Sequence, residues 1–178
     1  MDLFKKYNGE LFPRFADQVI DIDGKKIMIR TAQAADAESM VEVERAVYVG
    51  QAPWAAKSFL IEISKLGQRQ YLVATVNGQV IAFIGATFLK NYTEVHITNL
   101  AVSPVWQNHN IGSKLIKIIA EQTNQLNINL LTLEVRKSNE AAQRLYQRLG
   151  FKITGEKVEY YDNDHENALD MALYFKMN

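Results

Sequence analysis

Hydrophobic residues recur along the chain with two different spacings, and the spacing changes several times after residue 26. Short runs that are continuously apolar, or that alternate with polar residues, are typical of strands. They predict strands at residues 27–30, 71–76, 80–89, 94–102, 130–135, 151–154 and 168–175. Apolar residues spaced three or four positions apart predict helices at residues 36–48, 53–63, 112–124 and 141–149.

Turn and cap residues fall between these elements. Asn77 and Gly78 separate two apolar runs and favour a tight β-hairpin. Asp36 is placed to cap the first helix, Pro53 suits the first turn of the second, and Gly150 ends the last. Because a meander of antiparallel strands precedes a strand–helix–strand crossover, we predict a mixed α+β fold.

The first 26 residues lack this regularity. Pro13 interrupts them and Asp23-Gly24 marks a turn, so we expect an irregular extension at 1–26 and a globular domain at 27–178. The extension carries large aromatic side chains that we expect to dock on the domain: Phe4, Tyr7, Phe12 and Phe15.

The composition of the chain argues against several classes of function. The 178 residues include 20 Lys and Arg against 20 Asp and Glu, a balance that argues against a nucleic-acid-binding protein. The absence of cysteine excludes disulfides, thiolate metal sites and a cysteine nucleophile. The sequence shows no signal peptide and no apolar run of membrane-spanning length. We therefore expect a monomeric cytoplasmic protein without a membrane partner.

Residues 99–115 combine a strand, a turn with Pro104, a polar loop and the start of a helix. The first N–H groups of a helix lack partners within it, and they bind phosphate well. Gly112 has no Cβ and lets a ligand approach the backbone closely. The segment is a candidate pyrophosphate site, although a strand–loop–helix connection with one glycine is also common without any ligand.

A second candidate segment follows. Glu134 lies between Leu133 and Val135 in an apolar strand, where a carboxylate is costly unless it faces a cleft or a partner. Asn139 and Tyr146 are seven residues apart and share a helix face. If Glu134, Asn139 and Tyr146 meet in one cleft, they suit proton transfer during acyl transfer. Alternatively, Glu134 pairs with a basic residue at a sheet edge and Tyr146 is a core aromatic.

Between residues 29 and 175 the chain resembles the GNAT acetyltransferase family, and within it the bacterial RimI-type ribosomal-protein alanine N-acetyltransferases. The most specific motifs are Leu-Glu-Val-Arg at 133–136 and Leu-Tyr-x-x-Leu-Gly-Phe at 145–151. Ala-Pro-Trp at 52–54 and Thr-Asn-Leu-Ala-Val at 98–102 occur in the matching order. The resemblance implies a GNAT fold, a twisted and mostly antiparallel sheet flanked by helices and splayed at an acetyl-CoA cleft.

The resemblance also implies roles for individual residues. Glu134 would act as general base, Tyr146 would protonate the leaving thiolate, and the amine would attack the thioester directly. Tyr160 and Tyr161 would shape the acceptor side. The implied cofactor-binding residues are Leu100, Ala101, Val102, Gln107, Asn108, His109, Asn110, Ile111, Gly112, Ser113 and Asn139.

Asn110 departs from the family pattern, which usually has glycine there. Asparagine tolerates the left-handed backbone region better than most residues, so the turn can survive. Its side chain would nevertheless crowd the phosphates, and we expect weaker coenzyme A binding as a result.

Three further features have two interpretations. Glu94, which alternates with His96 on its strand, is the second candidate for the base. Trp54 is either a core residue or a wall of the acceptor groove. The acidic run at residues 162–166 lacks the spacing of a calcium loop, so we expect no metal there and a polar loop near the acceptor.

The predicted function is acetyl transfer from acetyl-CoA to a protein N-terminus, specifically the N-terminal alanine of a small-subunit ribosomal protein. Two alternatives stay open. The acceptor is a small amine, such as a polyamine, an aminoglycoside or an amino acid, or the chain is a non-catalytic GNAT-like binding module.

Overall fold

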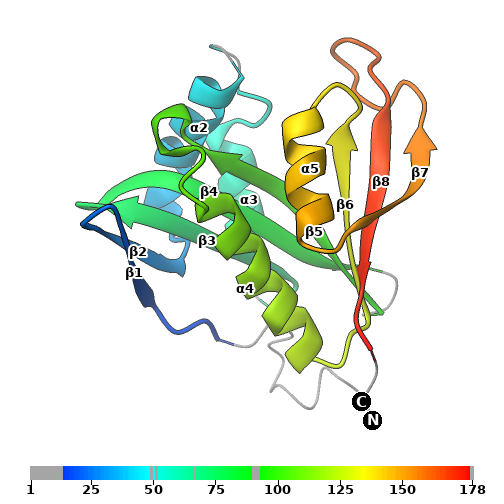
Figure 1. Ribbon diagram of the computed structural model, residues 1–178. Coiled ribbons are helices and arrows are strands. Elements are labelled where there is room, and N and C mark those ends of the chain that lie inside the picture. Colours follow the sequence, from blue (N-terminus) through cyan, green and yellow to red (C-terminus); the bar gives the residue numbers. More distant parts are fainter. Residues whose placement is uncertain (1–13, 49, 51, 66, 90–92, 177–178) are drawn as a thin grey trace.

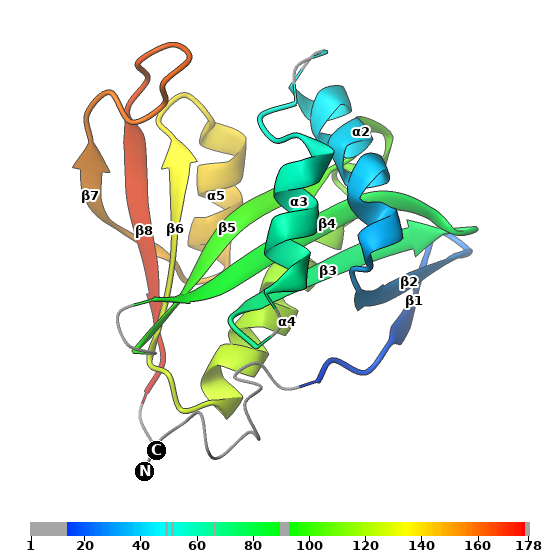
Figure 2. The same cartoon turned by 180° about the vertical axis from the view of Figure 1, so that it is seen from behind.

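The computed structural model describes residues 14–48, 50, 52–65, 67–89 and 93–176. These residues form one eight-stranded sheet with helices on both faces (Figure 1). Helices α4 and α5 cover one face, and α2 and α3 cover the other, as the reverse view shows (Figure 2). The mixed α+β fold predicted from the sequence is confirmed.

The strands are β1 Gln18–Ile22, β2 Lys25–Thr31, β3 Arg69–Val76, β4 Gln79–Leu89, β5 Glu94–Val102, β6 Leu130–Arg136, β7 Lys152–Lys157 and β8 Ala168–Tyr174. The helices are η1 Ala34–Asp36, α2 Ala37–Val47, α3 Ala56–Ser64, η3 Pro104–Trp106, α4 Ile111–Gln125 and α5 Glu140–Arg148. The strands are ordered β1-β2-β3-β4-β5-β6-β8-β7 across the sheet.

The sheet opens between β5 and β6. These two strands are parallel and pair only where Val95–Ile97 meets Leu131–Leu133. Beyond Ile97, β5 continues to Val102 beside β4, while β6 diverges from it toward β8 (Figure 1). The predicted splay of the sheet is thus confirmed, and it leaves one edge of the second half of β5 without a strand partner in the described sheet.

Each face of the sheet has its own apolar core. On one face α4 buries Leu115 and Ile119, which are fully inaccessible, against the central strands. On the other face Met40 of α2 and Phe59 of α3, also fully inaccessible, pack against β3 and β4. Because both cores hold the central strands, β5 is a rigid support for a site at the splay.

The prediction of an irregular stretch is wrong for residues 18–22. They form β1, antiparallel to β2, and the predicted Asp23-Gly24 turn joins the two strands. Inward positions Ile20 and Ile22 are half-buried while Val19 is exposed, so the alternation typical of an edge strand was present but short. Phe15 packs against the core as expected. Phe4, Tyr7 and Phe12 lie outside the described residues, and the division into 1–26 and 27–178 stays a prediction.

One helix start and one predicted helix cap also differ from the prediction. Helix α3 begins at Ala56 because Ala55 is extended, so Pro53 lies in the preceding bend. Asp36 occupies the N-cap position of α2, but its carboxylate makes no cap to that helix. It accepts a hydrogen bond from the Gln33 backbone N–H at 2.7 Å and pairs with Arg30 at 2.7 Å instead.

Candidate active site

A cavity of about 830 Å³ occupies the splay between β5 and β6. Its volume lies within the range of small-molecule sites. One end reaches the loop before α4, and the other reaches α2 and the loop between β7 and β8. The predicted site residues that line it are Trp54, Leu100, Ala101, Val102, Gln107, Asn108, Asn110, Gly112, Ser113, Glu134, Asn139, Tyr146, Tyr160 and Tyr161.

The loop before α4 has the backbone shape that a phosphate site needs. Asn108 and Asn110 both have left-handed backbone angles, with φ of 64° and 60°. Asn110 is the N-cap residue of α4, and its side chain makes no cap hydrogen bond. Gly112 and Ser113, in the first turn of this 15-residue helix, line the cavity, and the first N–H groups of a helix have no partner within it.

Gly112 lies among apolar side chains that line the cavity beside this loop. A Cβ at this position would make ordinary van der Waals contacts with Val102 at 3.5 Å and with Leu145 at 3.7 Å. Leu100 and Val102 project from the part of β5 that β6 does not pair. An apolar channel beside an unpaired strand edge, leading to helix N–H groups, fits an extended pantetheine arm followed by a pyrophosphate.

Two of the predicted loop residues do not line the cavity. The Ile111 side chain is buried in the core with 1% exposure. His109 is held outside by Asp23 of the β1–β2 turn, at 3.3 Å, and by the Gln107 carbonyl, at 2.7 Å. Gln107 in turn donates to the Val102 carbonyl at 3.1 Å, which fastens the loop to the end of β5.

Glu134 faces the cavity and also has partners on two strands. One oxygen lies 2.9 Å from His96 Nε2, and the other lies 2.5 Å from Lys157 Nζ. Burial alone would raise the carboxyl pKa, but hydrogen bonds from His96 and Lys157 outweigh it and lower the pKa to about 2. Lys157 lies on the edge strand β7, so the alternative of a sheet-edge pair is correct and coexists with the position at the cavity.

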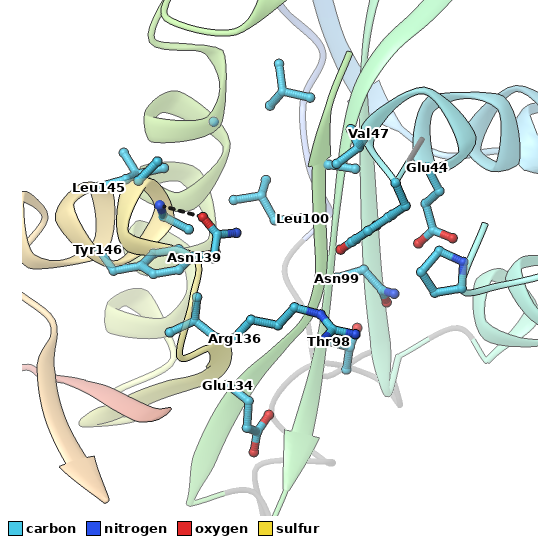
Figure 3. A pocket seen from close by; sticks show the side chains of 18 of the residues that line it. Glu44, Val47, Thr98, Asn99, Leu100, Glu134, Arg136, Asn139, Leu145 and Tyr146 are labelled. Carbon is cyan, nitrogen blue, oxygen red and sulfur yellow. Dashed lines mark hydrogen bonds between the residues drawn. The ribbon is translucent and has the colours of Figure 1, made fainter. Parts of the chain in front are cut away.

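Asn139, the N-cap residue of α5, and Tyr146, within α5, both line the cavity, as their spacing predicts (Figure 3). Asn139 Oδ1 accepts from the Ala142 N–H at 3.1 Å and caps the helix. Tyr146 is 8% exposed and packs against Phe151, with ring centroids 5.8 Å apart. Burial raises the pKa of its phenol above the ordinary value of 10.0, so Tyr146 carries its proton at neutral pH.

Tyr160 and Tyr161 form the rim opposite α2. Their rings meet edge to face at 5.2 Å, and Arg136 lies over Tyr161 at 3.9 Å. The same guanidinium binds Asp164 at 2.8 Å and Glu166 at 2.7 Å. The acidic run is therefore partly neutralised by Arg136 and folds as the polar loop that we expected, and within the described residues no acidic or histidine cluster could hold a metal.

Trp54 and Glu94, the remaining two candidate site residues, differ in whether they line the cavity. Trp54 packs against Phe59, with centroids 5.3 Å apart, and also lines the cavity, so both interpretations hold. Glu94 is 4% exposed and does not line the cavity. It accepts from Thr132 Oγ1 at 2.5 Å, and Thr132 in turn contacts His96 Nδ1 at 2.8 Å. The geometry thus favours Glu134 over Glu94 as the acidic group of the site.

Sequence reasoning missed Glu44 and Lys157. Glu44 of α2 is 3% exposed, lines the cavity and accepts from the Trp54 backbone N–H at 3.0 Å. Burial raises its carboxyl pKa to about 7. The available signal was its spacing, because an acid four residues after the buried Met40 lies on the apolar face of the helix.

Comparison with known proteins agrees with this geometry. Residues 37–151 match the Acetyltransferase (GNAT) family. The chain belongs to this family. It is 35% identical over 152 residues to a ribosomal protein bS18-alanine N-acetyltransferase from Haemophilus ducreyi, covering 83% of this chain and 99% of the relative. It is 29% identical to a Bacillus subtilis protein named as a putative enzyme of the same activity, covering 82% and 94%.

The fold also matches a crystal structure of the ribosomal-protein-S18-alanine N-acetyltransferase from Escherichia coli. The TM-score is 0.75 at 27% identity, with 85% of this chain and 96% of that chain covered. The resemblance to RimI-type enzymes and the GNAT fold are confirmed. This GNAT protein is an acetyl-CoA-dependent N-acetyltransferase. In the described residues, no helix is long and apolar enough to span a membrane.

Proposed function

We propose that this enzyme acetylates the α-amino group of a protein N-terminus, and that its acceptor is the N-terminal alanine of a small-subunit ribosomal protein. The supporting observation is similarity along nearly the whole length of relatives named for that reaction, covering 94% and 99% of two of them. These alignments cover 82% and 83% of this chain, at 29% and 35% identity.

The shape of the cavity supports a peptide acceptor. Its walls on the acceptor side come from segments far apart in the chain, Trp54 with α2 on one side and Tyr160 with Tyr161 on the other. Tyr160 is 44% exposed, so this end of the cavity meets the surface. A chain end can enter between these walls while the rest of the acceptor protein stays outside.

Acetyl-CoA is a substrate of the reaction. In the proposed reaction, the α-amine nitrogen attacks the thioester carbonyl carbon, a C–N bond forms, and the C–S bond breaks. Glu134 receives a proton from the nitrogen, and Tyr146 gives its phenolic proton to the departing sulfur. Both substrates are bound together, and no acetyl-enzyme forms.

The low pKa of Glu134 determines when the proton moves. A carboxyl with a pKa of about 2 is a weak base toward a free α-ammonium, whose pKa is about 8. The nitrogen becomes strongly acidic only as the C–N bond forms. We therefore assign Glu134 two steps: its carboxylate first accepts a hydrogen bond from the amine, and then takes the proton during attack.

We also propose that the enzyme acts as a cytoplasmic monomer and binds neither nucleic acid nor membrane directly. Its formal net charge of zero supports the absence of a general affinity for nucleic acid. Light scattering at micromolar concentration tests the oligomeric state. A monomer has a mass near 20.3 kDa.

A thiol-release assay tests the proposed activity. Wild-type enzyme and acetyl-CoA are incubated with a peptide that begins Ala-Arg, with spermidine, or with free lysine. We expect CoA release with the peptide, and a loss of roughly 10²-fold or more in kcat/KM for Glu134→Gln. Release with spermidine or lysine and none with the peptide would overturn the protein acceptor.

A small cationic amine is the second candidate, because Glu44, Glu134 and Asp162 all line the cavity. Carboxylates that bind an α-ammonium also attract a polyamine. The spermidine arm of the same assay separates the two candidates.

A further inference from the structure

The α2 wall of the cavity carries a buried carboxylate that the proposed reaction does not use. Glu44 is 3% exposed, and among the described residues its carboxylate accepts one hydrogen bond, from the Trp54 backbone N–H at 3.0 Å. Within the described residues, it forms no salt bridge with a Lys, Arg or His. A buried carboxylate without a cation loses solvation that one neutral hydrogen bond does not restore.

The position of Glu44 points to the acceptor. Glu44 and Glu134 both line the cavity, but they come from α2 and β6, with Thr98 and Asn99 of β5 drawn between them (Figure 3). Asn139 and Tyr146 lie on the far side of β5 from α2. Glu44 is therefore on the acceptor side, away from the group that receives the proton of the reacting amine.

We propose that Glu44 binds a second positive charge on the acceptor, namely a cationic side chain within its first three residues. This inference rests on the proposed acetylation of a peptide α-amine and adds a charge requirement to it. The cation provides the partner that Glu44 lacks, and the Trp54 N–H fixes the carboxylate toward the cavity.

Burial supports this assignment by its effect on protonation. It raises the pKa of Glu44 to about 7, so the carboxyl is partly neutral at physiological pH. A guanidinium or ammonium group beside it favours the ionised form. A purely structural Glu44 would need only an oxygen that accepts from Trp54, and a glutamine supplies that oxygen as well.

The test uses pairs of peptides that differ only in charge. Citrulline has nearly the shape of arginine and no charge. Peptides with arginine or citrulline at position two, or at position three, are compared by kcat/KM in the wild type, in Glu44→Gln and in the control Glu42→Gln. Glu42 is on the same helix, pairs with Arg45 and is 64% exposed, so its substitution makes the same charge change at the surface.

We expect the wild type and Glu42→Gln to prefer arginine over citrulline by about tenfold or more at one of the two positions. In Glu44→Gln this preference falls to about twofold or less, while kcat/KM for the citrulline peptides changes little. An equal loss on both peptides of each pair would show a structural role and overturn the inference. A preference that persists in Glu44→Gln would overturn it also.

Calorimetry separates this inference from the proposed function. If no peptide is acetylated, the proposed acceptor is wrong, and peptide binding to the enzyme–CoA complex is measured directly. Tighter binding of arginine peptides that depends on Glu44 would still support the inference. Equal binding of arginine and citrulline peptides would overturn it.

Discussion

The ion pair between Lys157 and Glu134 should make a measurable contribution to the free energy of unfolding. Its atoms are 2.5 Å apart, and Glu134 is 16% exposed while Lys157 is 42% exposed. The pKa of Glu134 falls from 4.5 to about 2, which corresponds to about 3 kcal/mol of interaction with all its partners together. Part of this shift comes from His96, and solvent screens the charge of the exposed lysine. We therefore expect the interaction between Lys157 and Glu134 to contribute about 1 kcal/mol to the free energy of unfolding.

The perturbation is Lys157→Met, combined with Glu134→Gln in a double-mutant cycle. Urea unfolding at pH 7 gives the free energy of unfolding for the four proteins, and the cycle isolates the coupling of the two side chains. Because the folded pKa lies below the unfolded value, the contribution is complete above pH 4.5. It is lost as the pH falls toward 2.

A coupling of about 1 kcal/mol that decreases in high salt would support the assignment. A coupling below about 0.3 kcal/mol would refute the argument that Lys157 holds down the pKa of Glu134. Lys157 also lies 3.2 Å from Asp170, and the cycle cancels that second interaction because Asp170 is present in all four proteins.

Three further changes test other parts of the site. Tyr146→Phe keeps the ring packed on Phe151 but removes the proton donor, so steady-state kinetics with acetyl-CoA should show a fall in kcat of roughly 10²-fold with little change in KM; an unchanged kcat contradicts its role as acid. Gly85→Ala places a Cβ against the ring of Tyr71, whose hydroxyl donates to Asn99 at 2.9 Å. This clash should lower the free energy of unfolding by about 1–3 kcal/mol in a urea titration, and an unchanged free energy would show that the ring can move aside. Asn110→Gly should keep the stability and tighten CoA binding in calorimetry, whereas Asn110→Ala should cost about 1 kcal/mol because φ is 60° there; weaker CoA binding by the glycine variant would show that the asparagine side chain helps the ligand.

Periodicity and turn chemistry predicted most of the sheet. The bounds 94–102 of β5 agree with the structure, and Asn77-Gly78 forms the expected hairpin with φ of 49° and 81°. Strand β1 was missed because an edge strand of five residues with only two inward aliphatic side chains gives a weak pattern. The start of α3 was placed too early because proline favours a first helical turn but does not require one.

The candidate site was predicted best where its residues are near in sequence. Asn139 is the N-cap residue of α5 and Tyr146 lies within that helix, so their spacing was enough to place both beside the same cavity. The partner of Glu134 was not predictable from the sequence, because Lys157 is 23 residues away on a strand that reaches β6 only through β8. Glu44 was missed because the pattern marked its helix face as apolar, and only the folded chain shows a cavity there.

The most direct test of the central claim is the position of the acetyl group on a peptide that begins Ala-Lys. This acceptor offers an α-amine and a side-chain amine to the same enzyme. Tandem mass spectrometry after reaction with acetyl-CoA should place the acetyl group on the alanine nitrogen, and Glu134→Gln should slow that product. Acetylation of the lysine side chain, or of neither amine, would contradict the assignment of this cavity to protein N-terminal acetylation.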